Sequence, residues 1–326
     1  MSILNDVYYS KKYASLYLKN GEEIFEFSYK NNGYIFYQLS IKRPILKIGK
    51  YLINEGFYDL ETPYGYGGLY VNTDDIEFLQ KAFAAYQERC NKEKIIAEFS
   101  RFHPFNTFAQ EHKDYFDMCI LDRDVVVVDL VQSKEERWSK YSSNTRNILR
   151  RAEKTLTFSK SDEVEIFQEM YYKTMQRNNA DKFFYFDKEY FINLMSMNNV
   201  SLYKVAYQEN IISMAFFMFG EDFVHYHLSA NDLRFSKLNS NYFILENSFE
   251  LSRKSLKKYF LLGGGKTSTR DDSLFKFKNK FSDFYKPFYI AGKIFNYEKY
   301  NEYNDLWRAQ GVGGDVRYFL KYRLDV

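Results

Sequence analysis

The stretch VSLYKVAYQENIISMAFFMFGEDFVHYHLSA, residues 200–230, decides the fold of this chain. It divides into three runs rich in β-branched and aromatic residues, and the separators between the runs are short and either polar or glycine-containing. Such separators indicate hairpin turns, so the stretch predicts three consecutive antiparallel strands, a meander. The runs are 200–207, 211–220 and 222–230, and the separators are Gln208-Glu209-Asn210 and Gly220-Glu221.

Helical patterns precede and follow this meander in the sequence. The first of them opens with Ser133 and Glu136, which have the spacing of a capping box. Helices, an antiparallel meander, another helix and a further strand together predict a mixed α+β lobe. We expect helices at 133–155, 161–179, 187–197, 241–258 and 273–281, and strands at 259–262 and 287–295.

A second α/β lobe is predicted upstream of the meander. The chain has 326 residues, more than the usual ~100–200 residues of one domain. We therefore expect one lobe at 1–132 and another at 133–295, with the tail 296–326 packing against the first. The upstream lobe is expected to contain strands within 22–48, a loop rich in glycine and tyrosine at 61–72, a helix at 74–94, and strands at 95–101 and 124–131.

Charge and cysteine content exclude several classes of protein. Lys and Arg number 46 against 43 Asp and Glu, a net charge of +3, far from the basic excess of a dedicated nucleic-acid binder. Cys90 and Cys119 are too few for a disulfide framework, and no His, Cys, Asp and Glu cluster has metal-ligand spacing. No run of ~18 apolar residues occurs. We expect a soluble cytoplasmic protein with no metal, no DNA partner and no transmembrane segment.

Six segments, in order along the chain from about residue 60 to 290, resemble FemAB-like acyltransferases, a branch of the GNAT superfamily. ETPYGYGGL and RFHPF resemble parts of the first lobe of that family, and NTRNILRRAEK resembles the helix that leads into the second. The other three resemble the second lobe. The segments are 61–69, 101–105, 144–154, 167–194, 224–230 and 261–289.

The resemblance implies an α+β fold of two GNAT-like lobes, with mixed, largely antiparallel sheets flanked by helices and the active site in the cleft between the lobes. It implies an N-acyltransferase with no permanently bound cofactor. The leading hypothesis is transfer from acyl-CoA, as co-substrate, to the amine of a nucleotide-linked amino sugar for surface polysaccharide synthesis. One alternative is an aminoacyl-tRNA-dependent transferase acting on a peptidoglycan precursor, and a second is a non-catalytic binding module.

Two residues are candidates for the chemical step. His225 and His227 are two apart on a predicted strand and should point to one face, and a neutral imidazole can accept the proton of an attacking amine. The resemblance favours His227 as this base, because its strand commonly faces the acyl donor in GNAT lobes. Lys278 matches a family lysine that follows a Phe near the reacting carbonyl, where an ammonium would stabilise the oxyanion. The alternative for Lys278 is a solvated lysine on an amphipathic helix.

The acceptor is expected to contact residues from both lobes. Arg177 can bind phosphate oxygens in a bidentate fork, and Tyr185, in the run Phe183–Phe186, can stack on a base or sugar. These aromatics are otherwise ordinary core residues. The glycine-rich loop ETPYGYGG lets its backbone approach a ligand closely. We expect Tyr64, Tyr66, Gly67 and His225 to complete the acceptor site.

The donor site is expected at the loop 232–241, where GNAT lobes bind the CoA pyrophosphate at a helix N-terminus. The loop departs from the family pattern because it has no glycine. GGGKTS at 263–268 is not a phosphate-binding loop of the Walker type, because Phe260 stands where that motif needs a glycine. The expected donor-binding residues are Arg234, Lys237, Ser240, Asn241, Gly264 and Gly265.

Overall fold

The computed structural model describes residues 3–311 and 318–325, and its chain forms two compact units. The meander unit comprises Met1–Val7 and Arg123–Lys286, and the α2 unit comprises Tyr8–Asp122 and Pro287–Val326. The chain passes between the units at three points: between Val7 and Tyr8, within strand β8 (Met118–Asp129) and within strand β14 (Phe284–Ile294). The lobe boundaries expected from sequence lay at 132/133 and 295/296. Residues 312–317 and 326 of the expected tail lie outside the described residues.

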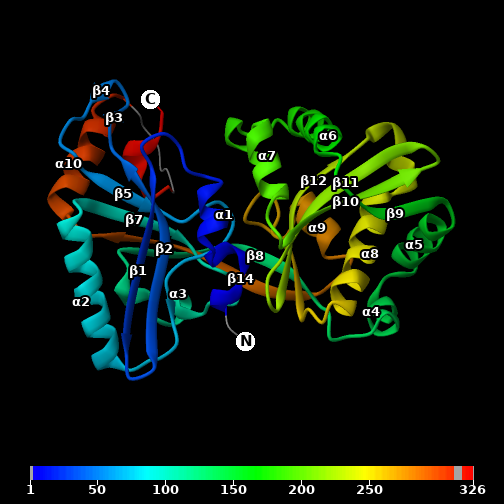
Figure 1. Cartoon of the computed structure of the whole chain (residues 1–326), viewed down its shortest axis with the longest axis horizontal. Coiled ribbons are helices and arrows are strands. Elements are labelled where there is room, and N and C mark those ends of the chain that lie inside the picture. Colours follow the sequence, from blue (N-terminus) through cyan, green and yellow to red (C-terminus); the bar gives the residue numbers. More distant parts are fainter. Residues whose placement is uncertain (1–2, 312–317, 326) are drawn as a thin grey trace. The chain divides into compact units, whose positions relative to one another are not determined.

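The predicted meander is the centre of the meander unit (Figure 1). Strands β10, β11 and β12 pair antiparallel in succession, as the sequence predicted. Strand β12 also pairs with β13 in parallel, and β13 pairs antiparallel with β8. The order in this unit is β8-β13-β12-β11-β10-β9, and the bounds are β9 Leu156–Ser161, β10 Val200–Tyr207, β11 Asn210–Phe219, β12 Phe223–Asn231 and β13 Tyr259–Gly263.

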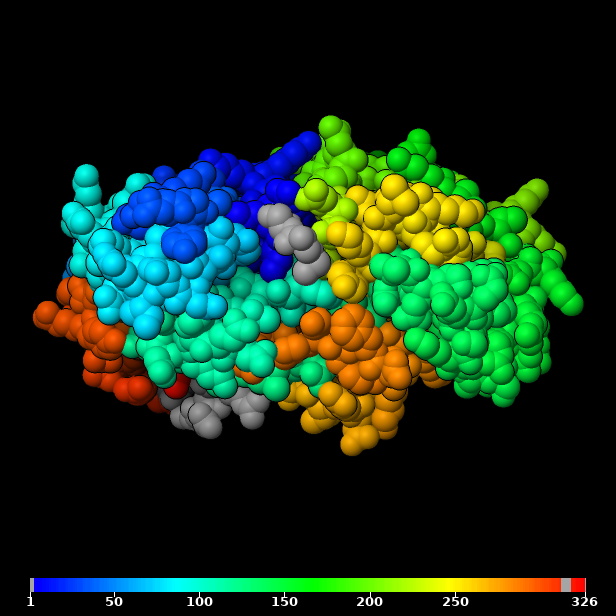
Figure 2. All heavy atoms as spheres, turned by 90° about the horizontal axis from the view of Figure 1, so that it is seen from below, coloured from blue at the N-terminus to red at the C-terminus, as the bar shows by residue number. Residues whose placement is uncertain are grey.

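Helices cover both faces of this sheet. Phe216 of β11 packs against Phe167 of α6 and Phe191 of α7 on one face. On the other face Phe260 of β13 packs against Phe249 of α8. Figure 2 shows α5, in green, against α8, in yellow, at the surface of this unit. The bounds are α4 Lys134–Lys140, α5 Ser143–Thr155, α6 Val164–Arg177, α7 Lys188–Met195, α8 Ser240–Lys254 and α9 Ser273–Lys278.

The sequence predicted one helix at 133–155, but the structure has two helices there, α4 and α5. The prediction of a single helix is therefore wrong. The expected capping box of Ser133 and Glu136 is present at the start of α4. The chain then leaves the helical conformation at Tyr141, whose ψ is 146°. Ser142 starts α5 by accepting a hydrogen bond from the Thr145 N–H, so a second N-cap within the stretch breaks it.

The α2 unit has its own sheet, in the order β1-β2-β5-β7-β14, with helix α2 packed on one side. Helix α10, absent from the sequence-based expectations, packs with the chain end in a separate core that includes Ile96, Trp307 and Leu320. Arg323 is tied to the buried Asp59 by an ion pair of 2.7 Å. The main bounds are β1 Glu23–Asn31, β2 Tyr34–Pro44, β5 Tyr58–Glu61, β7 Ile95–Arg101, α2 Ile76–Lys92 and α10 Tyr297–Arg308.

The remaining elements of the α2 unit are short. Strands β3 (Lys47–Ile48) and β4 (Tyr51–Leu52) form a separate hairpin, and β6 (Tyr70–Val71) pairs with β2. Helices α1 (Lys11–Ser15) and α3 (Phe108–Glu111) complete it, with short 3-10 turns. Among the described residues, no helix is both long enough and apolar enough to cross a lipid bilayer.

Candidate active site

The parallel strands β12 and β13 stop pairing before either strand ends. Their register runs from Phe223 opposite Tyr259 to His225 opposite Leu261. Past this point β12 continues to Asn231 and is bulged at His227, because Phe217 and Phe216 of β11 pair with the residues on either side of it. Ligands of sheets with parallel strands bind outside the carboxyl ends of those strands. The carboxyl ends of β12 and β13 are therefore the first place to search for a site in this unit.

The two strand histidines share one face of the sheet, as predicted. His227 lies on the face covered by α7, since its Nε2 is 2.8 Å from the Tyr190 hydroxyl. His225 lies opposite Met218, two residues from Phe216, whose ring packs on α6 and α7. The Tyr190 ring in turn stacks on Phe186, with 4.2 Å between the ring centroids. His227 is thus held in place by Tyr190 of α7, whose ring is supported by that of Phe186.

Burial determines the protonation state of His227. Desolvation by burial, with the neighbouring His225 as the smaller cause, lowers the pKa of His227 to about 3. The imidazole is therefore neutral throughout the range in which proteins work, and its affinity for a proton is low. The neutral imidazole is hydrogen-bonded to the Tyr190 hydroxyl, and the role of base suggested for His227 stays a prediction.

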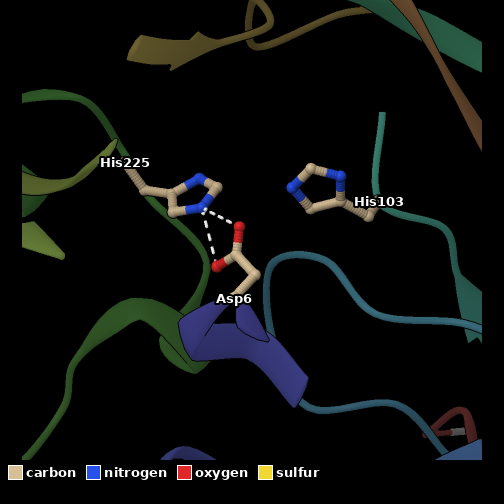
Figure 3. A group of neighbouring side chains, drawn as sticks. All are labelled: Asp6, His103 and His225. Carbon is tan, nitrogen blue, oxygen red and sulfur yellow. Dashed lines mark hydrogen bonds and ion pairs between the residues drawn. The ribbon is translucent and has the colours of Figure 1, made fainter. Parts of the chain in front are cut away.

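His225 is held by the start of the chain, which the sequence gave no reason to expect. Figure 3 shows the Asp6 carboxylate pointing at the His225 ring. Its two oxygens lie 2.8 and 3.0 Å from His225 Nε2. Both side chains are almost fully buried. The backbone of Asp6 also packs closely on Gly220, where an added Cβ would be 3.3 Å from the Asp6 Cα. Because Nε2 is engaged by Asp6, His225 positions the N-terminal segment in this structure.

Lys278 is buried, which excludes the solvated alternative. Lys278 is the last residue of helix α9, and its side chain is buried in the meander unit. Its Nζ donates a hydrogen bond of 2.6 Å to the Gly264 carbonyl. Its neighbour Lys276 is exposed and pairs with Asp271. Desolvation lowers the pKa of Lys278 to about 7, with Asp272 opposing the change and Arg123 adding to it. This amine exchanges its proton near neutral pH.

The glycines after β13 are required by close packing within the protein. A Cβ on Gly264 would lie 2.6 Å from the Arg123 Cδ, and one on Gly265 would lie 2.5 Å from an Asp272 carboxylate oxygen. Arg123 also donates a 2.8 Å hydrogen bond to the Gly265 carbonyl. The sequence suggested that these glycines let a ligand come close to the backbone. In this structure it is the side chains of Arg123 and Asp272 that lie close to them. Those two residues fix the loop that accepts the Lys278 hydrogen bond.

The loop between β12 and α8 leads into a helix N-terminus that has no side-chain cap. Asn239 precedes α8 in the left-handed conformation, with φ of +54° and ψ of +40°, and its side chain makes no capping hydrogen bond. Asn adopts this conformation more readily than most residues. Asn239 therefore gives the loop 232–241 the left-handed backbone that a glycine would otherwise supply. The first backbone N–H groups of α8 therefore have no side-chain cap, and the positive end of the helix dipole lies there.

The predicted donor residues of this loop differ in availability. Arg234 is exposed but paired with the Asp232 carboxylate at 2.6 Å. Lys237 is exposed, and Ser240 is buried in the first turn of α8. The Asn241 Oδ1 accepts a long hydrogen bond of 3.4 Å from the Ser213 hydroxyl. Lys237 and the backbone of Ser240 and Asn241 are thus the groups best disposed toward an anion.

Of the predicted acceptor residues, Arg177 reaches the end of strand β12. Arg177, at the end of α6, donates a 3.2 Å hydrogen bond to the side chain of Asn231, the last residue of β12. Tyr185 is 37% exposed, and its ring lies 5.9 Å from that of Tyr172. Phe183 beside it is 49% exposed, so this run is not simply core.

The other predicted acceptor residues belong to the α2 unit. The Tyr64 carbonyl accepts a 2.8 Å hydrogen bond from Tyr13, and the Gly67 carbonyl accepts one of 2.5 Å from Tyr9. Tyr66 packs edge-to-face on Tyr8, with 5.2 Å between centroids. Both carbonyls of this loop are therefore bound by N-terminal tyrosines of the same unit.

One exposed group in the α2 unit has the donor types of a metal site. The ligand atoms of Asp74, Glu111 and His112 lie within 4.8 Å of one another. His112 Nε2 already lies 2.8 Å from the Asp74 carboxylate, and Glu111 accepts a 2.9 Å hydrogen bond from the Thr107 hydroxyl, so hydrogen bonds within the protein account for the cluster. The absence of a metal stays a prediction.

Comparison with known proteins shows the fold. No protein-family model matches the chain, and no curated protein matches its sequence. Among solved structures, FemX is similar with a TM-score of 0.71, 14% identity, and coverage of 92% of this chain and 94% of that one. The C-terminal domain of a putative lysylphosphatidylglycerol synthetase from Agrobacterium fabrum is similar with a TM-score of 0.53, 15% identity and coverage of 91% and 90%. The structure of L-PGS from Bacillus licheniformis has a TM-score of 0.51, 14% identity and coverage of 83% and 84%. At these identities the likeness shows the fold alone, and the predicted mixed fold of helices and sheets, of the kind seen in FemX, is confirmed.

Proposed function

We propose that this chain is an N-acyltransferase that moves an acyl group from acyl-CoA to the amine of a nucleotide-linked amino sugar. The observation that carries the proposal is the arrangement at the carboxyl ends of β12 and β13. β12 carries a neutral histidine, His227, and leads through a short loop to the uncapped N-terminus of α8. The buried Lys278, with a pKa of about 7, is bonded to the Gly264 carbonyl just past the end of β13. Acyl transfer needs an anchored donor, a proton acceptor and a stabilised oxyanion.

The donor is proposed to bind through its pyrophosphate at the start of α8. Backbone N–H groups at a helix N-terminus, together with the helix dipole, attract phosphate oxygens. The left-handed Asn239 leaves these N–H groups without a side-chain cap, and Lys237 adds an exposed positive charge. Arg234 joins them if phosphate displaces its Asp232 partner.

Lys278 is the residue we assign to proton transfer. The acceptor amine attacks the thioester carbonyl, so a C–N bond forms, the carbonyl π electrons move to oxygen, and the nitrogen must lose a proton before the CoA thiolate leaves. An amine with a pKa of about 7 can accept that proton near neutral pH and return one to the thiolate. In its protonated form it also stabilises the oxyanion, the role that the sequence suggested. His227, neutral and bonded to Tyr190, orients this part of the site.

The acceptor is proposed to lie near the end of β12. Arg177 is placed there by its hydrogen bond to Asn231 and can bind a diphosphate, while the exposed Tyr185 can stack on a base or sugar. Tyr64, Tyr66 and Gly67 complete the proposed acceptor set.

Two observations favour a second candidate, an aminoacyl-tRNA-dependent transferase acting on a peptidoglycan precursor. One similar structure is named for lysylphosphatidylglycerol, an aminoacylated lipid. In the part of the chain that the structure describes, Arg150, Arg151 and Lys154 of α5 have no carboxylate partner and form an exposed basic surface. Contacts with tRNA phosphates release counterions, so this candidate predicts an affinity that falls steeply with salt.

A thermal-shift screen tests the donor class first. A ligand at ~100 times its dissociation constant adds about 2.7 kcal/mol to the free energy of unfolding if it binds only the folded state. Stabilisation by CoA together with UDP- or dTDP-amino sugars supports the proposal, and turnover with an acyl-CoA then eliminates a non-catalytic module. If CoA leaves the melting temperature unchanged and charged tRNA raises it, the result favours the second candidate, the aminoacyl-tRNA-dependent transferase. Lys278→Met should reduce turnover by ~100-fold or more, and Lys276→Met on the same helix is the control.

A further inference from the structure

The β3–β4 hairpin of the α2 unit holds apolar side chains in solvent. Leu46 is 62% exposed, Leu52 is 80% exposed and Tyr51 is 40% exposed. Single apolar residues on a surface are ordinary, but these three lie within seven consecutive residues on one hairpin. In Figure 1 the hairpin lies beside the C-terminal part of α10.

The hairpin is fixed in this exposed position. Gly49 has a φ of +54°, which suits the two-residue turn between Ile48 and Tyr51. The Ile48 side chain is fully buried in the core that contains Trp307, and the Gln310 side chain accepts from the Lys50 N–H at 2.8 Å and donates to the Ile48 carbonyl at 3.2 Å. The exposed side chains therefore cannot turn inward unless Ile48 leaves the core.

The charged side chains of the hairpin itself have one sign. Lys47 and Lys50 are exposed, and neither pairs with a carboxylate among residues 3–311 and 318–325. No Asp or Glu occurs between Arg43 and Asn54 in the sequence. The Lys50 Nζ lies 5.4 Å from the centre of the Tyr51 ring. Two exposed carboxylates of α10, Glu302 and Asp305, are paired with Lys299 and Arg308. Leucines flanked by a tyrosine and lysines, in a hairpin with no acidic residue of its own, match the chemistry of an anionic membrane interface.

We propose that this hairpin docks the protein on an anionic lipid surface, with Leu46 and Leu52 inserted among the acyl chains and Lys47 and Lys50 at the headgroups. The leucines supply apolar burial and the lysines supply attraction to negative headgroups, the two terms that drive interfacial binding. This attachment to a membrane is independent of the proposed reaction, since it requires neither acyl-CoA nor aminoacyl-tRNA.

Vesicle co-sedimentation of the full chain tests the proposal. We expect wild-type protein to sediment with phosphatidylglycerol vesicles and at least tenfold less with phosphatidylcholine vesicles. L46S/L52S should lower the partition coefficient at least tenfold, because the apolar contribution is lost. K47E/K50E should also lower it at least tenfold on the anionic vesicles, and because it leaves the leucines in place it serves if the serine variant fails to fold.

The control is Ile76→Ser, which removes an apolar side chain of similar exposure, 68%, from helix α2 of the same unit. The proposal is overturned if wild-type protein does not sediment with anionic vesicles, if it binds neutral vesicles equally well, or if Ile76→Ser weakens binding as much as L46S/L52S. It is also overturned if wild type self-associates in sedimentation velocity and L46S/L52S abolishes that association, because a second copy then covers the patch.

Discussion

Replacing Lys278 by methionine should remove a pH dependence from the stability of the meander unit. Burial lowers the pKa of Lys278 to about 7, whereas an unfolded lysine titrates near 10.5. Between these values the unfolded chain binds more protons than the folded one, so the free energy of unfolding rises with pH. At about 1.4 kcal/mol for each pH unit, the full effect is at most about 5 kcal/mol.

The assay is urea unfolding at pH 6, 7, 8, 9 and 10. The chain has two tryptophans, Trp138 in the meander unit and Trp307 in the α2 unit, so a Trp307→Phe background makes fluorescence report on the meander unit. The wild-type midpoint should rise between pH 7 and 10. Between pH 7 and 10, the free energy of unfolding of Lys278→Met should rise by at least ~2 kcal/mol less than that of wild type. Loss of the hydrogen bond to Gly264 lowers the free energy of unfolding of the variant by about 1 kcal/mol at every pH and leaves this difference in slope unchanged.

The exposed Lys276 provides the matched control on the same helix, because it pairs with Asp271 in solvent. Lys276→Met should leave the pH dependence unchanged. Equal slopes for wild type and Lys278→Met would refute the assignment of a buried, nearly neutral amine. The same variant in a turnover assay then separates loss of chemistry from loss of fold.

Three further substitutions test other parts of the structure. Gly264→Ala places a Cβ 2.6 Å from the Arg123 side chain and should lower the stability of the meander unit by ~1–3 kcal/mol in the Trp138 urea assay. Arg137→Met leaves the buried Glu246 carboxylate without its ion pair and should destabilise the same unit by ~3–5 kcal/mol, while a change below ~1 kcal/mol argues against a buried pair. Burial raises the pKa of Glu98 above its usual range, so wild type should lose stability as pH rises through that pKa. Glu98→Gln should remove this loss, measured by Trp307 fluorescence from pH 4 to 8.

The meander was predictable because its signals are local. The runs of β-branched and aromatic residues and the short separators between them all lie within residues 200–230, and no distant contact is needed to interpret them. The break between α4 and α5 was also encoded locally, in Ser142, but the helical pattern continued across it and hid the second cap. Hairpin β3–β4 and helix α10 were missed because two-residue strands carry no periodicity and α10 lies in the tail that pattern did not resolve.

The candidate site was less predictable because its properties depend on burial. Lys276 and Lys278 look alike in sequence, yet one is exposed and the other has a pKa near 7. His225 meets Asp6 across 219 positions of sequence, a pairing that no local signal announces. Asn239 could be read only as a polar loop residue, since its left-handed backbone is visible only in the structure.

The central claim is that an acyl-CoA donor binds at the carboxyl ends of β12 and β13. Hydrogen exchange measured by mass spectrometry, with and without saturating CoA, tests it most directly, because phosphate at the start of α8 slows exchange of the N–H groups that lack a side-chain cap. The account predicts slower exchange in peptides that cover 232–245, and unchanged exchange in peptides of β1 and β2. Saturation by CoA with no change at 232–245, or protection of that segment by tRNA and not by CoA, would contradict it.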